Sequence, residues 1–221
     1  MNLIQVSKEL EQDRVISHND DNSRGMRLYL FPLFLQTAIF FISFMTRIIP
    51  APILPQIERD IGIGHAAAGS IFLFISLGYF IAMMGSGFVS STFNHRRTIL
   101  ISAFSFGIAI IITSFSSNIL SLCLGFLLVG LTAGLYLPSG IATITDIVDK
   151  KNWGKALAIH ELAPNLSFVL APIVAEILMR WFSWDVILVI MGFTSMLFGL
   201  FFWAMGKGGY FKGEKPRISV F

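Results

Sequence analysis

Charged residues are scarce in this sequence. Asp, Glu, Lys and Arg make up 13% of its 221 residues, whereas hydrophobic residues make up 55%, and the mean hydropathy is +0.75. A soluble domain carries about 25% charged residues. The scarcity excludes an ordinary soluble domain, and we expect most of the chain to cross a lipid bilayer.

Other absences narrow the class of protein further. The single cysteine, Cys123, cannot form an internal disulfide, and we expect it to be a small buried hydrophobic residue. The sequence has no Gly-x4-Gly-Lys-Ser/Thr loop for a nucleotide and no residue spacing typical of a metal site. We therefore predict no cofactor and no bound metal. Any energy for the protein's work should come from a gradient, unless the protein only equilibrates its solute.

The sequence also lacks the motifs of a membrane-embedded hydrolase. An intramembrane serine protease has six helices with Gly-x-Ser-Gly on the fourth, but residues 137–140 read LPSG and lack the first glycine. The histidine that such a protease needs in its sixth helix is also missing. We predict that the protein is not an enzyme.

Six segments are long and apolar enough to be transmembrane helices, which need about 20 residues each. Residues 98–145 contain no formal charge, which is too long for one helix and suits two, with SFSSN at residues 114–118 as the turn. The expected spans are 28–50, 61–95, the two halves of 98–145, 156–179 and 186–206. The sequence therefore predicts an all-α membrane protein, a six-helix bundle over residues 28–206, behind a polar tail at 1–27.

The positive charges indicate how the spans are oriented. Because loops between spans are short and cytoplasmic loops are enriched in Lys and Arg, the basic clusters identify the cytoplasmic side. These clusters are Lys8, Arg14, Arg24 and Arg27; Arg96 and Arg97; Lys150, Lys151 and Lys155; and Lys207, Lys212, Lys215 and Arg217. We predict a multi-pass protein of the cell membrane with both termini cytoplasmic. This topology explains the pI of about 9.2 without a nucleic-acid partner.

Two similar stretches indicate an internal repeat. Residues 50–58 (PAPILPQIE) and 138–146 (PSGIATITD) both run nine residues from a proline to a carboxylate. They close the predicted first and fourth spans, which have opposite orientations. The pattern predicts an inverted three-plus-three repeat, as many secondary transporters have.

Residues 85–97 (GSGFVSSTFNHRR) resemble the signature loop between the second and third helices of the major facilitator superfamily. Gly87 and the two closing arginines match that pattern. Ser91, Thr92 and Asn94 stand where the family has Asp, Arg and Gly. The departures put in doubt any charge-based gate that the family builds from that Asp.

Two further stretches resemble the same family. Residues 125–159 are similar to its fourth helix and following loop, where Gly130 and Gly134 form a seam that lets helix backbones approach closely. Residues 167–176 resemble the antiporter motif of the fifth helix, with Pro172 in place. The resemblance implies the N-terminal six-helix half of the fold, with residues 207–221 as the start of the central cytoplasmic loop. It also implies a C-terminal half or a second copy as partner.

Arg47 is the most unusual residue of the first span, because a permanent cation is costly in lipid. It can snorkel to the outer interface, since Pro50 lies only three residues on, or it can face the bundle centre and pair with an anion. Gln36, Phe40, Ser43 and Arg47 lie on one stripe of a helix, and a polar stripe should face a cavity. Some facilitator families for organic anions carry an arginine in the first helix, and this chain resembles them at that position.

Matching stripes occur on two other spans. They are Thr132, Tyr136, Ser139 and Thr143 on the fourth, and Glu161, Asn165, Phe168 and Pro172 on the fifth. Tyr136 and Asn165 join Gln36, Ser43 and Arg47 as candidate substrate-binding residues. The alternative for the fourth stripe is structural, because Ser and Thr side chains also bond their own helix backbone.

Glu161 is the candidate proton-coupling residue. It lies six residues past Lys155, about 9 Å along a helix, where an ionised carboxylate should be paired, hydrated or protonated. The alternative is a structural ion pair or hydrogen bond near the cytoplasmic rim. We expect His160 to point to a different face, and Glu176 to pair with Arg180 one turn later.

These observations favour a secondary active transporter that moves a small organic solute by alternating access. An anion is the favoured solute, and proton coupling is an option. Two alternatives stay open: a non-transporting membrane scaffold or assembly partner, and a drug-type efflux pump. The polar stripes distinguish the scaffold, in which they would be packed dry rather than lining a solvent cavity.

Overall fold

The computed structural model describes residues 29–214, and within that range every regular element is a helix. Six helical spans are long and apolar enough to cross a membrane. They are Tyr29–Ile61, which ends in α2 (Pro50–Ile61); α3 (His65–Phe93); α4 (His95–Ser114); Ile119–Ile147, made of α5 (Ile119–Ala133) and α6 (Tyr136–Ile147); Lys150–Met179, made of η1 (Lys150–Asn152) and α7 (Trp153–Met179); and α8 (Trp184–Met205). The predicted all-α membrane architecture is confirmed.

The first span is longer than the sequence suggested. We predicted that it ends at Pro50, but Pro50 begins α2, and the helix continues to Ile61. Proline suits the first turn of a helix, because its missing N–H would have no partner there. The span breaks only at Ile49. Gly62, with a φ of 72°, then ends it in the left-handed conformation.

The fourth span is broken in the same way. It bends between Ala133 and Tyr136, and its second segment, α6, has 12 residues, as α2 has. The two similar stretches of sequence fall in these two segments. In addition, α3 and α2 of the first three spans pack against α5 and α7 of the last three spans, respectively. This arrangement is consistent with the inverted repeat, which stays a prediction.

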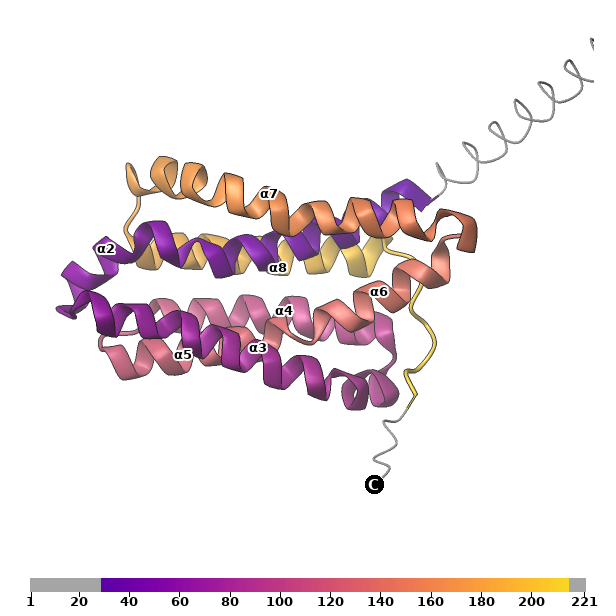
Figure 1. Ribbon diagram of the computed structural model, residues 1–221, viewed down its shortest axis with the longest axis horizontal. Coiled ribbons are helices and arrows are strands. Elements are labelled where there is room, and N and C mark those ends of the chain that lie inside the picture. Colours follow the sequence, from indigo (N-terminus) through magenta and orange to yellow (C-terminus); the bar gives the residue numbers. More distant parts are fainter. Residues whose placement is uncertain (1–28, 215–221) are drawn as a thin grey trace, which may run out of the picture.

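Figure 1 shows the first span, α7 and α8 on one side of the bundle and α3, α4 and α5 on the other. Glycines let two helix pairs approach backbone to backbone. A Cβ at Gly130 of α5 would lie 2.2 Å from the carbonyl oxygen of Ile75 on α3, and a Cβ at Gly78 would lie 2.2 Å from that of Leu127. The predicted glycine seam of the fourth span therefore packs against α3.

One arginine of the signature loop ties the end of α8 to the start of α4. Arg96 donates to the carbonyl oxygens of Gly206 (2.7 Å), Trp203 (2.9 Å) and Phe202 (3.1 Å). A cation that bonds the last carbonyls of a helix also complements the helix dipole. Asn94 replaces the family's glycine at a φ of 71°, and asparagine tolerates this left-handed conformation better than most residues.

The segment after α8 docks on the bundle, and we call residues 206–214 the strap. Figure 1 shows it as the yellow trace that leaves α8 and passes the end of α6. Its backbone bonds to three elements: the Gly209 oxygen accepts from Arg96 N (2.7 Å), Gly209 N donates to Asp146 Oδ2 (3.1 Å), and Gly213 N donates to Ser90 O (3.1 Å). The strap therefore connects α3, α4 and α6 at one end of the bundle.

Candidate functional site

Arg47 lies inside the first span rather than at its end. Fourteen residues of the span follow it, up to and including Ile61, about 21 Å at 1.5 Å per residue, so the proximity of Pro50 gives no reason to expect snorkelling. Its Nε donates to the Ser43 carbonyl oxygen at 3.3 Å. Its guanidinium carbon stands 4.6 Å from the ring centre of Phe44 and 4.3 Å from that of Tyr79 on α3. The cation is thus held by aromatic faces.

The Arg47 guanidinium has hydrogen-bonding capacity to spare. Its Nη2 is buried and has no hydrogen-bond partner among residues 29–214. No carboxylate of residues 29–214 forms an ion pair with it. The side chain lines a cavity of about 240 Å³ between the first span and α3, whose other walls are Phe44, Ile48, Phe72, Ile75, Ser76 and Tyr79. We call this the Arg47 cavity.

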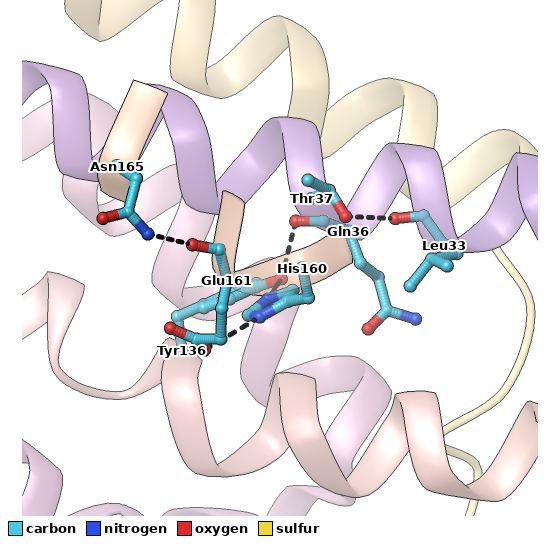
Figure 2. A network of polar contacts seen from close by, with 7 residues as sticks. All are labelled: Leu33, Gln36, Thr37, Tyr136, His160, Glu161 and Asn165. Carbon is cyan, nitrogen blue, oxygen red and sulfur yellow. Dashed lines mark hydrogen bonds and ion pairs between the residues drawn. The ribbon is translucent and has the colours of Figure 1, made fainter. Parts of the chain in front are cut away.

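A second polar group joins the first span, α6 and α7, and Figure 2 shows it. The Tyr136 hydroxyl donates to the Gln36 carbonyl oxygen at 2.6 Å and lies 3.1 Å from His160 Nε2. His160 Nδ1 lies 3.3 Å from Glu161 Oε1. Asn165 Nδ2 donates to the Glu161 carbonyl oxygen at 2.8 Å. We call Tyr136, His160 and Glu161 the relay.

Aromatic stacking fixes the relay and links it to the Arg47 cavity. Phe40 stacks on the His160 ring (centroids 4.6 Å apart, planes at 5°) and on the Tyr136 ring (5.4 Å, 16°). Phe44, whose ring lies under the Arg47 guanidinium, meets Phe40 in an edge-to-face contact with centroids 6.0 Å apart. One column of side chains along the first span therefore connects the cation with the relay.

Gln36 contributes its backbone to the relay, but its side chain is unpartnered. The residue is fully buried, and neither Oε1 nor Nε2 has a hydrogen-bond partner in the part of the chain that the structure describes. Figure 2 shows the amide pointing away from Tyr136 and His160. A buried amide without partners costs about 1–3 kcal/mol, so this position is expensive for the fold.

The predicted polar stripes do not share one cavity. Within the six-helix unit Gln36, Ser43 and Tyr136 are buried in packing, and the expectation that the stripe of the first span lines a cavity stays a prediction for these residues. Arg47, the last residue of the first-span stripe, borders a cavity. Asn165 and Glu161 are exposed on α7. The structure thus brings Gln36, Tyr136, Glu161 and Asn165 together and leaves Arg47 and Ser43 farther along the first span.

His160 is the residue that sequence reasoning missed. We expected it to point to a different face from Glu161, because successive residues on a helix do not face each other. Its side chain is indeed buried where that of Glu161 is exposed, yet its Nδ1 still contacts the Glu161 carboxylate while its Nε2 reaches Tyr136. The signal available in the sequence was a histidine beside an acid inside an apolar span. The ion pair that we expected between Glu176 and Arg180 is confirmed, with Arg180 Nη2 and Glu176 Oε1 3.5 Å apart.

This chain matches one protein family and several individual transport proteins. A family model described as Major Facilitator Superfamily matches residues 37–218. The chain is 28% identical over 153 residues to the inner membrane metabolite transport protein YdjE of Escherichia coli (strain K12), covering 65% of this chain and 33% of that protein. It is 21% identical over 145 residues to the 4-hydroxybenzoate transporter PcaK of Pseudomonas aeruginosa, covering 66% of this chain and 32% of that protein. The matched region is thus about a third of each relative.

Solved structures agree with the fold. A bacterial homologue of the human lysosomal transporter Spinster, inward-facing and unoccupied, superposes with a TM-score of 0.70 at 16% identity, covering 86% of this chain and 46% of that one. A D-xylose-proton symporter gives a TM-score of 0.70 at 14% identity, covering 82% of this chain and 49% of that one. This chain spans just under half the length of both.

Proposed function

The chain belongs to the Major Facilitator Superfamily, and from this premise we propose that it is the N-terminal six-helix half of a secondary transporter for a small organic anion. Members of this family are transporters rather than enzymes. We further propose that the protein lies in the inner or plasma membrane with both termini cytoplasmic. A second six-helix unit, either a C-terminal half or a second copy, would form the other wall of the path that the solute takes. Residues 207–221 then begin the central cytoplasmic loop.

One observation carries the choice of an anion. The Arg47 guanidinium borders a cavity, has a buried Nη2 without a protein partner, and forms no ion pair within residues 29–214. A guanidinium presents a planar fork that suits a carboxylate with two parallel hydrogen bonds. A carboxylate on the substrate would supply the missing partner.

The aromatic lining of the Arg47 cavity narrows the class of substrate. Phe44, Phe72 and Tyr79 form its walls, and flat rings prefer to pack against other rings. One relative is a 4-hydroxybenzoate transporter, so an aromatic carboxylate is the first probe to use. Glu161, with a side chain 53% exposed, is the proposed proton carrier, and one structural neighbour is a proton symporter.

Uptake of radiolabelled 4-hydroxybenzoate by cells that express the complete transporter tests this function. We expect Arg47→Lys to weaken uptake, because lysine keeps the charge but loses the fork, and Arg47→Gln to weaken it more. Membrane abundance should be unharmed in both, since an uncharged side chain is cheaper in lipid. Wild-type uptake in both variants would remove Arg47 from the site.

A scaffold or assembly partner is the second candidate. The observation that favours it is the dry packing of Gln36, Ser43 and Tyr136 inside the bundle. A scaffold would need no anion at Arg47. Absence of uptake for every carboxylate tested, with normal membrane abundance of the wild type, would favour this candidate over transport.

A further inference from the structure

The Tyr136 hydroxyl determines the direction of each hydrogen bond in the relay. The Tyr136 hydroxyl has one proton and two possible partners, the Gln36 carbonyl oxygen at 2.6 Å and His160 Nε2 at 3.1 Å. A carbonyl oxygen can only accept, and two oxygens at 2.6 Å without a proton between them would repel. The hydroxyl proton therefore lies on the bond to Gln36.

This assignment fixes the tautomer of His160. Because the hydroxyl proton of Tyr136 is in the hydrogen bond to Gln36, the Tyr136 oxygen can only accept a hydrogen bond from the imidazole, so Nε2 must carry a hydrogen. A neutral imidazole has one N–H, which leaves Nδ1 bare. The bare Nδ1 then faces Glu161 Oε1 at 3.3 Å, and an ionised carboxylate is also only an acceptor.

Two acceptors in contact require a proton between them. We infer that His160 and Glu161 share one exchangeable proton, which sits on Nδ1 or on the carboxyl group, and that the pair rather than Glu161 alone is a proton-binding site. The pair is defined by its geometry alone. Its use for coupling solute movement to a proton gradient rests on the proposed function.

The two members of the pair have different access to the surroundings. The His160 side chain is fully buried and the Glu161 side chain is 53% exposed, so the proton enters and leaves through Glu161. Loss of the proton leaves two lone pairs facing each other, and the contact opens. Phe40 and Tyr136 clamp the imidazole, so we expect the Glu161 carboxylate to be the part that moves.

The neighbours of the pair leave this assignment intact. Tyr136 from α6 is the titratable group that faces His160, and the first span contributes only the Phe40 ring and the Gln36 carbonyl. On α7, Asn165 bonds the Glu161 backbone and not its carboxylate. Within the part of the chain described, no lysine or arginine forms an ion pair with Glu161.

Nitrogen-15 NMR of histidine-labelled chain in lipid nanodiscs tests the inference, with His160 assigned by its loss in His160→Gln. We expect Nε2 to stay protonated through a pH titration and the pair to release one proton, seen at Nδ1. Glu161→Gln should remove that shared-proton transition, because an amide N–H can donate to a bare Nδ1. Tyr136→Phe should release the tautomer, so that both neutral forms appear.

A neutral His160 with its proton on Nδ1 and a bare Nε2 in the wild-type chain would overturn the inference. So would an unchanged titration in Glu161→Gln. The Glu161 side chain is half exposed, so we expect this variant to fold as the wild type does. The NMR experiment needs no transport, so it can succeed where the proposed function fails. Conversely, uptake that is normal in Glu161→Gln beside a confirmed shared proton would reject only the coupling role.

Discussion

At the scale of the residue, the clearest cost to stability is the Gln36 side chain. We expect Gln36→Met, which keeps the approximate length and shape, to raise the free energy of unfolding by about 1–3 kcal/mol, because it removes a buried amide without protein partners. Reversible unfolding in mixed micelles measures this. Gln36→Asn is the control, since it keeps an amide and should not stabilise. A Met variant less stable than wild type would show that the amide is satisfied.

The Gln36 variant also separates stability from function. If the amide is kept because the transporter uses it, Gln36→Met should lose uptake while it gains stability, as functional sites often show. Uptake and unfolding should therefore be measured on the same preparation. A variant that is both more stable and fully active would mean that Gln36 has no part in transport.

At the scale of the element, the approach of α3 and α5 depends on glycine. A Cβ at Gly130 would meet backbone atoms of Ile75 and Tyr79, so we expect Gly130→Ala to lower the free energy of unfolding by about 1–3 kcal/mol. Gly85→Ala on α3 is the matched control, because nothing lies within 4 Å of its Cβ position. The control should be neutral or slightly stabilising, since alanine is the better helix former. Equal effects of the two substitutions on unfolding would argue against the seam.

The two arginines of the signature loop provide a second matched pair. Arg96 bonds three carbonyl oxygens at the end of α8, whereas the Arg97 side chain is exposed and forms no hydrogen bond in the described structure. We expect Arg96→Gln to lower the free energy of unfolding by about 1.5–3 kcal/mol and Arg97→Gln to change it by less than about 0.5 kcal/mol. The same unfolding assay compares them. Similar values for both would show that the cap on α8 contributes little.

The elements also show how far sequence alone could predict this molecule. Six helices and the glycine seam follow from long apolar runs and small residues, which are properties of the local sequence. The extension of the first span past Pro50 does not, because a proline can stop a helix or begin one. The contact of His160 with Tyr136 and the docking of the strap depend on tertiary packing, which no periodicity encodes.

At the scale of the whole molecule, the orientation in the membrane can be tested with two loops. Ser117 lies between α4 and α5, and Asp149 lies between α6 and α7, both exposed. In a Cys123→Ala background, a cysteine at Ser117 should react with an impermeant maleimide added outside intact cells, and a cysteine at Asp149 only after lysis. The reason is that the basic clusters mark the cytoplasmic side. Labelling of both from the same side would reject the six-span topology.

The central claim is that Arg47 binds the carboxylate of the solute, and a differential binding measurement tests it most directly. Calorimetry of this chain in nanodiscs would compare 4-hydroxybenzoate with its methyl ester, which keeps the ring but loses the charge. We expect the wild type to prefer the acid and Arg47→Gln to lose that preference, because the guanidinium fork is the group that distinguishes them. The same preference in both proteins, or none in the wild type, would contradict the claim.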